Sequence, residues 1–367
     1  MSFSRRWHRL ALVGLLAVPA CATNHAKRGD GVPQAGAPPA ASGSGTQVPA
    51  EAWPRFTLQA SQSWLLNSPH GERFDASGLL LTPSGQLLTV NDRGPELYAI
   101  NFTEGRASAD LVLLPNCFTP EQLKPLAGAK TGGHYDCEGM AQDEAGRLYL
   151  CEETDRWILR WDPKTEAVER LAIDWSPVKQ YFSATDSNAS FEGIAVGRDR
   201  LYVANEREKA RLIVVDLARL KVVDHFVARP TNKPKGDVQY SDLCWFEDAL
   251  WVLCRKSQVV LKVDPAAHQV LAEYDYRALE NAPATRYFTL IPFGLMEGLA
   301  VDKDNIWLVT DNNGLLRTAK LTDTRPTLYR CPRPDRKRDA YEVPFQRTAF
   351  GLVGSALLHP GPAPGAN

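Results

Sequence analysis

Alternating apolar and polar positions recur along the chain as short hairpins. Each hairpin has an apolar strand, a turn rich in Gly, Asp or Asn, and a second apolar strand that ends in polar or acidic residues. A period of two residues, with no helical period of comparable strength, is typical of β-strands. Five such hairpins align, with starts 49–61 residues apart: 77–94, 138–155, 192–208, 241–257 and 297–313. A repeat of this kind predicts an array of similar β units.

Further strands follow these hairpins. We expect third strands at 157–163, 211–217 and 259–265, and fourth strands at 109–114, 168–173, 221–227, 269–274 and 326–330. Four antiparallel strands repeated around a ring form a β-propeller, which leaves few open sheet edges. The sequence therefore predicts an all-β propeller with five four-stranded blades. Residues 55–66 can add an edge strand to the last blade and close the ring, and a sixth blade from 53–70 and 341–358 is the alternative.

The first twenty residues have the features of a signal peptide. Arginines at positions 5, 6 and 9 precede an apolar run at 10–18 that is too short to span a bilayer. Small residues then lead into Cys21, a pattern that resembles the bacterial lipobox, in which the cysteine is acylated. We predict a signal peptide at 1–20 and a lipid anchor at Cys21, which places the protein in the cell envelope, on the outer membrane or periplasmic face. An ordinary cleaved signal peptide is the alternative.

The rest of the chain divides by composition. Residues 21–52 are mostly Ala, Gly, Pro and Ser and predict a flexible tether, because they offer little apolar surface to bury. We assign 53–340 to the propeller and 341–367 to a C-terminal extension. With 44% hydrophobic residues and a net charge of −1, the chain can form a large core and has no basic excess for nucleic acid. We expect a monomer.

Acidic residues recur at the open end of the hairpins. In a propeller the first strand of each blade lines the central channel, and the second strand returns antiparallel. The start of one strand and the end of the next therefore lie at the same mouth. The starts are Ser77, Glu138, Glu192, Ser241 and Glu297, and the ends, 14 or 15 residues later, are Asp92, Glu153, Glu206, Arg255 and Asp311.

Seven crowded carboxylates repel one another unless a cation compensates their charge. A site with only oxygen ligands, and no His or Cys cluster, suits a hard cation that takes six to eight oxygens, and Ca²⁺ fits this description. The predicted calcium ligands are Glu138, Glu192, Glu297, Asp92, Glu153, Glu206 and Asp311. The alternative is a solvated rim, since strand ends and turns are normally polar.

The fourth blade has Arg255 where the other blades have an acid. Its guanidinium can either pair with an acid of the mouth or bind an anionic group of a substrate. Arg93 and Arg207 lie one position beyond the acidic ends and can join it. His70 and His134 lie in loops that lead into blades one and two and are candidate general bases, with a solvated loop histidine as the alternative.

These motifs resemble the phytase-like β-propellers, the family with esterase-like activity of phytase, over about 75–335. The resemblance implies a propeller that hydrolyses phosphate esters or other esters of a small anionic molecule, with the seven acids as metal ligands and Arg255 as a substrate contact. One position departs from the family, because Cys254 stands where a Glu is usual. Since no nucleophile elbow, zinc-helix or phosphate-loop motif is present, a non-catalytic, calcium-stabilised scaffold is the alternative.

The chain has six cysteines besides Cys21. The compartment outside the inner membrane permits disulfides, and the candidate pairs are Cys137 with Cys151, Cys244 with Cys254, and Cys117 with Cys331. The last pair would join the two ends of the ring. Small buried thiols are the alternative for each of them.

Overall fold

The computed structural model describes residues 53–126, 135–186, 188–231, 238–290 and 294–336. The chain divides into two units, Met1–Val48 and Pro49–Asn367, and every described residue belongs to the second. This unit is all-β, as predicted: its helices are α1 (Pro120–Leu123), α2 (Arg277–Glu280) and the 3-10 turns η1 (Lys124–Leu126), η2 (Ser176–Tyr181) and η3 (Arg255–Ser257). Among these described residues, none of the helices has the length and apolar character needed to span a bilayer.

All five predicted hairpins are formed. Each is a pair of neighbouring antiparallel strands, as the alternation of apolar and polar residues predicts. The pairs are β3 (Ala76–Leu81) with β4 (Leu87–Asn91), β7 (Cys137–Gln142) with β8 (Leu148–Glu152), β11 (Phe191–Gly197) with β12 (Arg200–Asn205), β15 (Asp242–Phe246) with β16 (Ala249–Cys254), and β19 (Met296–Val301) with β20 (Asn305–Thr310).

Two outer strands extend four of the hairpins in chain order. They are β5 (Leu97–Asn101) and β6 (Ser108–Leu113), β9 (Trp157–Asp162) and β10 (Ala167–Arg170), β13 (Arg211–Asp216) and β14 (Lys221–Phe226), and β17 (Val259–Asp264) and β18 (Gln269–Asp275). The last hairpin differs. Its third strand is β21 (Thr327–Pro332), which pairs directly with β20, so the prediction of a fourth strand at 326–330 was wrong by one place.

The fourth place beside β21 belongs to the N-terminal strand β2 (Gln62–Asn67), as the closing role expected for 55–66 requires. The preceding strand β1 (Arg55–Thr57) instead pairs in parallel with β18. Both described strands of 53–70 thus extend groups that other residues form. Residues 341–358, the other half of the alternative sixth blade, lie outside the described residues.

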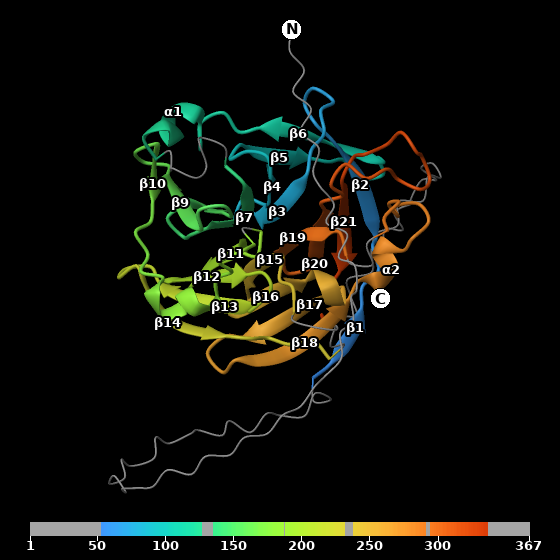
Figure 1. Ribbon diagram of the computed structural model, residues 1–367. Helices are drawn as coiled ribbons and strands as arrows, with labels where there is room; N and C mark the ends of the chain where they lie inside the picture. The colour runs from blue at the N-terminus through green and yellow to red at the C-terminus, as the bar shows by residue number, and fades with distance from the viewer. Residues whose placement is uncertain (1–52, 127–134, 187, 232–237, 291–293, 337–367) are drawn as a thin grey trace, which may run out of the picture. The chain divides into compact units, whose positions relative to one another are not determined.

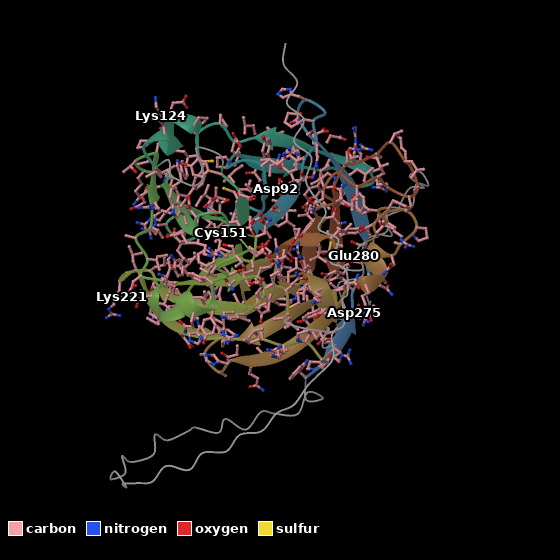
Figure 2. All side chains as sticks on the ribbon, in the orientation of Figure 1. Asp92, Lys124, Cys151, Lys221, Asp275 and Glu280 are labelled. Atoms are coloured by element: carbon pink, nitrogen blue, oxygen red, sulfur yellow. The ribbon has the colours of Figure 1, made fainter. Side chains whose placement is uncertain are left out.

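The first strands of the five groups form a closed circle. β3 contacts β7, β7 contacts β11, β11 contacts β15, β15 contacts β19, and β19 contacts β3 again. Figure 1 shows these strands near the centre, with β6, β10, β14 and β18 outside them. β2 also pairs in parallel with β6, which joins the first and last groups at their outer edges, so the described strands form four sheets. Asp92 and Cys151 lie toward the middle of this circle, whereas Lys221 lies at its periphery (Figure 2).

The core lies between neighbouring groups of strands. Trp64 of β2 stacks on Trp307 of β20 with ring centroids 6.2 Å apart, and Phe102 packs against both. Comparable apolar clusters fill the other contacts between groups. Burying a large apolar side chain contributes about 1.5–3 kcal/mol. The groups are therefore held to one another chiefly by apolar packing.

The six cysteines of the described region are free thiols, so none of the three candidate disulfides is formed. The strand register explains why the two hairpin disulfides are absent. Cys137 lies opposite Glu152, and Cys244 lies opposite Trp251. The third disulfide is absent because Cys117 and Cys331 belong to different apolar clusters. The structure thus bears out the alternative of small buried thiols at five of these positions, and Cys244 is partly buried.

Candidate functional site

The Gly of the repeated Glu-Gly pair lets the inner strands approach one another. A Cβ atom on Gly139 would lie 2.6 Å from Gly193 Cα, and one on Gly193 would lie 2.5 Å from Asp242 Cα. Gly78 and Gly298 have equally close backbone neighbours. Only Gly tolerates such an approach of one backbone to another. The glycines therefore form the narrow centre of the ring.

The residue before each of these glycines is positioned by a β-bulge. A bulge adds a residue to one strand and changes the direction of the side chains beside it. Four hairpins have such an interruption of register. The residues that lie within it include Ser77, Glu138, Glu192 and Glu297. β15 pairs with β16 without one. The bulge thus accompanies the three Glu-Gly pairs and Ser77-Gly78, and it is missing where the pair is Ser241-Asp242.

The second-strand ends lie beside the residues that precede the first strands. The backbone N–H groups of Asp92 and Glu153 donate to the carbonyls of Asp75 and Asp136, at 3.1 and 2.8 Å. Asp75 and Asp136 are two acids of the mouth that the sequence analysis missed. Each lies two positions before an aligned hairpin start, and this shared spacing is the signal that could have identified them.

The tightest cluster of acids is Asp136, Glu138 and Glu153, whose carboxylates each place one oxygen within 4.8 Å of the others. Ser77 lies close enough to Glu138, and Glu153 close enough to Glu192, to lower the pKa of Glu138 and Glu192 against the effect of burial. Burial, followed by the charges of Glu192 and Asp136, raises the pKa of Glu138 well above its usual range. Burial and the neighbouring acids also raise the pKa of Glu153. Uncompensated negative charge is therefore strongly disfavoured here.

A second group of acids joins the first hairpin to the last. Burial and the charge of Asp311 raise the pKa of Asp92 to about 8. Burial and the charge of Asp75 raise the pKa of Asp311 to about 7. Arg73 partly compensates this group, since its Nε lies 2.8 Å from Asp75 Oδ1.

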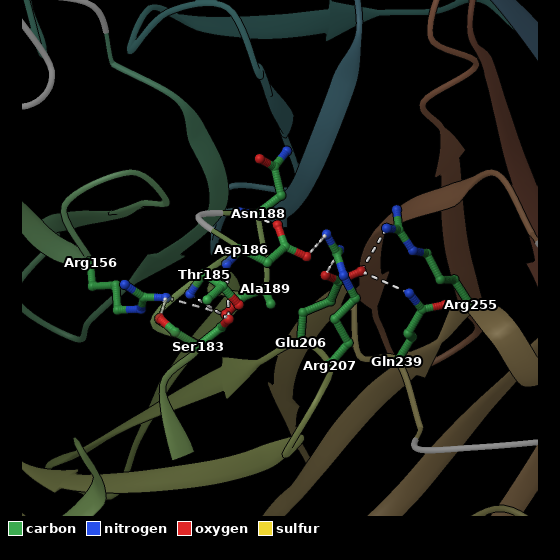
Figure 3. Close-up of polar contacts among 10 residues, drawn as sticks. All are labelled: Arg156, Ser183, Thr185, Asp186, Asn188, Ala189, Glu206, Arg207, Gln239 and Arg255. Atoms are coloured by element: carbon green, nitrogen blue, oxygen red, sulfur yellow. Dashed lines mark hydrogen bonds and ion pairs between the residues drawn. The ribbon is translucent and has the colours of Figure 1, made fainter. Parts of the chain in front are cut away.

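Arg255 lies between two of the predicted acids. Its guanidinium donates to Glu206 Oε1 at 2.6 Å and also contacts Glu297. Arg207 contacts Glu206 and pairs with Asp186 at 3.1 Å, and Gln239 donates to Glu206 at 3.3 Å (Figure 3). Arg255 thus makes the first of the two contacts considered for it, a pair with acids of the mouth.

The positive charge of Arg255 also acts on other acids of the mouth. It opposes the rise in pKa that burial causes at Glu192 and at Asp311. Arg255 therefore links the tight cluster to the group around Asp92. All seven predicted carboxylates belong to this one electrostatic network, and their role as metal ligands stays a prediction.

The remaining predicted residues lie apart from this network or outside the described part. His70 is exposed, and its backbone N–H donates to Glu72 at 3.0 Å. His134 and Cys21 lie outside the described residues. Neither histidine is therefore identified as a general base of this network, and both stay predictions.

Several buried oxygens of the mouth suit a cation. Asp92 Oδ1, Glu153 Oε1 and Glu297 Oε2 are buried and, within the described part of the chain, have no hydrogen-bond partner. An unpartnered buried oxygen costs free energy that a bound cation can recover. Because the donors are carboxylates with amide and hydroxyl neighbours, the residues fit a hard cation such as Ca²⁺ better than Zn²⁺.

Asp242 is a further acid that the sequence analysis missed, and it lies in the ring itself. It is fully buried at the place of the glycine in the fourth blade, and its carboxylate accepts the N–H groups of Leu243, Leu299 and Leu79 at 2.8, 2.7 and 3.2 Å. The change from Glu-Gly to Ser241-Asp242 was its signal in the sequence. Since its oxygens receive backbone donors from three strands, its role is to join blades.

A closed circle of inner strands, with acids gathered beside it, is the arrangement of a β-propeller. The family described as "Phytase-like: Esterase-like activity of phytase" matches residues 72–314, two thirds of the chain, and the chain belongs to this family. This confirms the resemblance found in the sequence.

One solved structure supports the fold, and a second with a lower score is also similar. Glutaminyl cyclase from Myxococcus xanthus superposes with a TM-score of 0.50 at 16% identity, over 76% of this chain and 97% of that chain. Virginiamycin B lyase from Staphylococcus aureus gives a TM-score of 0.37 at 12% identity, over 74% of each chain. No curated protein matches the sequence. At 16% identity, the likeness to glutaminyl cyclase extends to the fold alone.

Proposed function

We propose that this protein is a lipid-anchored, five-bladed propeller of the bacterial cell envelope that hydrolyses phosphate esters or other esters with the help of calcium. The observation that supports it best is the cluster of Asp136, Glu138 and Glu153, with one oxygen of each within 4.8 Å of the others. Membership of the phytase-like family supports the ester chemistry. The closed circle of five inner strands supports five blades.

Calcium would be held by the tight cluster together with neighbouring acids of the mouth. Asp136, Glu138 and Glu153 supply the first oxygens, and Glu192 is close enough to Glu153 for the two to affect each other's pKa. Asp92, Glu206, Glu297 and Asp311 complete the set of predicted ligands. A bound divalent cation polarises an ester and lowers the pKa of bound water.

The chain itself would position the substrate. Arg255 holds a guanidinium at the mouth, between Glu206 and Glu297, where it attracts an anionic group. Arg207, on the other side of Glu206, adds a second positive charge. His70 and His134 stay candidates for the general base, at the loops that lead into the first two blades. The preferred substrate is a small anionic ester.

The test uses the chain from Ala22 to Asn367, which retains every described residue. Titration calorimetry with CaCl₂ measures binding, and hydrolysis of nitrophenyl phosphate and nitrophenyl acetate is followed with and without EDTA. Glu153→Gln should weaken calcium binding about tenfold or more and abolish EDTA-sensitive turnover. Glu169→Gln, an exposed acid on β10, is the matched control and should change neither. Equal effects of the two variants would contradict a calcium site at the mouth.

A second candidate, a calcium-stabilised scaffold without turnover, is favoured by the paired state of Arg255. Both of its described ionic partners are acids of the protein, which compensate the positive charge of the guanidinium. A calcium-dependent melting temperature with no hydrolysis across the ester panel would support the scaffold. A separate experiment tests the lipid anchor by measuring incorporation of labelled fatty acid. Cys21→Ala should abolish this incorporation.

A further inference from the structure

Two loops beside the mouth pair with each other. Residues 281–290 follow α2, and residues 313–322 follow β20; together they are called the apolar loop pair. Phe288 N–H donates to Leu316 O at 2.7 Å, and Thr318 N–H donates to Arg286 O at 2.9 Å. Between these two bonds, Tyr287 and Arg317 form an antiparallel bridge. In Figure 1 the apolar loop pair is drawn orange to red, at the edge near α2 and β21.

The two bridge residues of the apolar loop pair, Tyr287 and Arg317, point inward. Arg317 is only 7% exposed and contacts the carbonyl of Ala284. The Tyr287 hydroxyl donates to Arg325 O at 2.6 Å and lies 2.8 Å from Thr327 Oγ1. These buried hydrogen bonds fix the loops to β21. The apolar loop pair is therefore a supported platform.

The apolar residues point outward, which inverts the usual alternation. Residues next to the buried bridge lie on the opposite face of the ladder. Phe288 is 60% exposed and Leu316 is 40% exposed, and Leu290 and Leu321 nearby are 91% and 63% exposed. Soluble proteins seldom gather large apolar side chains on one exposed surface without a binding partner. This arrangement points to a partner that receives apolar side chains.

The charges on the apolar loop pair have one sign. Its exposed charged residues are Arg286 and Lys320, both positive. The nearby acids Asp311 and Asp323 are buried, and Asp323 is paired with Arg325 at 2.7 Å. Exposed apolar side chains flanked by cations, with no exposed acid among them, match the interface of a bilayer that contains anionic lipids.

We propose that the apolar loop pair docks on an anionic lipid bilayer, with Phe288, Leu290, Leu316 and Leu321 entering the interface and Arg286 and Lys320 contacting headgroups. A second copy of the chain fits less well, because a stable dimer interface uses about 20–30 residues a side. A tether that is flexible leaves the orientation of the propeller open. The docked loops set it. This surface depends neither on calcium nor on hydrolysis.

Docking would also bring the channel mouth to the lipid surface. β19 starts with Met296 and Glu297 shortly after the first loop, and Asp311 lies two residues before the second. The mouth and the apolar loop pair therefore share one end of the last blade. Esters presented by the bilayer would lie within reach of the acidic cluster.

The experiment measures sedimentation with vesicles of the chain from Ala22 to Asn367, which lacks the acylation site. Vesicles of phosphatidylethanolamine with phosphatidylglycerol should bind the protein, and vesicles of phosphatidylcholine alone should bind it more weakly. Phe288→Ser with Leu290→Ser should lower the bound fraction about tenfold, since two apolar side chains no longer enter the interface. Arg286→Glu with Lys320→Glu should lower it on phosphatidylglycerol vesicles and leave binding to phosphatidylcholine unchanged.

The matched control is Val112→Ser with Leu113→Ser, which removes two exposed apolar side chains from β6. This control should bind vesicles as the unchanged chain does, and all variants should keep its melting temperature. Equal binding by the Phe288/Leu290 variant and the unchanged chain would overturn the proposal. So would a dimer in solution that the Phe288/Leu290 variant dissociates, because the partner would then be a second copy.

Discussion

The carboxylate of Asp242 accepts the backbone N–H of Leu299 at 2.7 Å, across the boundary between the fourth and fifth groups of strands. The same oxygen accepts Leu79 N–H, from the first group, at 3.2 Å. One buried side chain thus joins three inner strands at the place where the other groups have Gly. In a ring held mostly by apolar packing, these directional bonds fix the register of one blade against the next.

Replacing Asp242 by Ala should lower the free energy of unfolding by about 3 kcal/mol, because buried N–H groups on three strands lose their acceptor. Asp242→Asn keeps an acceptor oxygen of the same size and should cost less. Chemical denaturation of both variants measures the difference. An Ala variant as stable as the unchanged chain would show that the bonds to Leu79 and Leu299 are not needed.

The ring should reject a methyl group at Gly193. A Cβ there would lie 2.5 Å from Asp242 Cα, so Gly193→Ala must move one inner strand and should cost more than about 3 kcal/mol. Gly85→Ala is the control, because its Cβ meets nothing within 4 Å and only its φ of +83° is unfavourable. The control should lose about 1 kcal/mol. Thermal and chemical unfolding distinguish the two, and equal losses would contradict the close approach.

Stability without calcium should decrease as pH rises. The pKa of Asp92 is about 8 and that of Asp311 about 7 in the folded protein, against about 4 in an unfolded chain. Between these values the folded state binds more protons than the unfolded state, so stability falls from about pH 5 to about pH 8 and then levels off. Melting temperatures in EDTA measure this slope.

Two additions test its origin. Asp311→Asn should reduce the slope, because it removes one of the two groups, and saturating calcium should flatten it by stabilising the ionised acids. Stability that rises with pH over this window in EDTA would contradict the crowding of acids at the mouth.

Arg255 should act as an internal counter-cation. Arg255→Met leaves Glu206 and Glu297 without their shared partner and should cost about 2–4 kcal/mol in the absence of calcium, because both acids are buried. Arg255→Met combined with Glu206→Gln should recover part of this loss. Arg93→Met, at an exposed guanidinium 3.7 Å from Asp75, is the control and should lose little. A double variant no more stable than Arg255→Met would show that the pair is not the cause.

Local patterns were enough to predict the hairpins but not the order of strands in the last group. Alternation marks β21 as a strand, and nothing near it in the sequence tells whether its neighbour is β20 or another strand. The place of β21 in its group depends on β2 (Gln62–Asn67), a strand from the other end of the chain that takes the fourth position. Pairing between distant segments leaves no periodic trace in either of them.

The candidate site was predicted in the same uneven way. The constant spacing identified Glu138, Glu192 and Glu297, because a bulge and a Gly recur beside each. Asp75 and Asp136 were missed because they recur in only two of the five repeats. The predicted Cys137–Cys151 disulfide was wrong for a physical reason, since a shift of one residue in register sets Cys137 against Glu152 and not against Cys151.

β2 gives the ring an order of assembly. Its partner β21 is about 265 residues away in sequence, with Gln62 opposite Arg330, and such distant pairing slows folding. During synthesis or export from the N-terminus, β2 emerges before every strand of the five hairpins, and its edge toward β21 stays unpaired until β21 appears. Closing the ring thus joins an N-terminal strand to the last described strand, and a truncation before Thr327 would leave β2 without its partner in the fifth group.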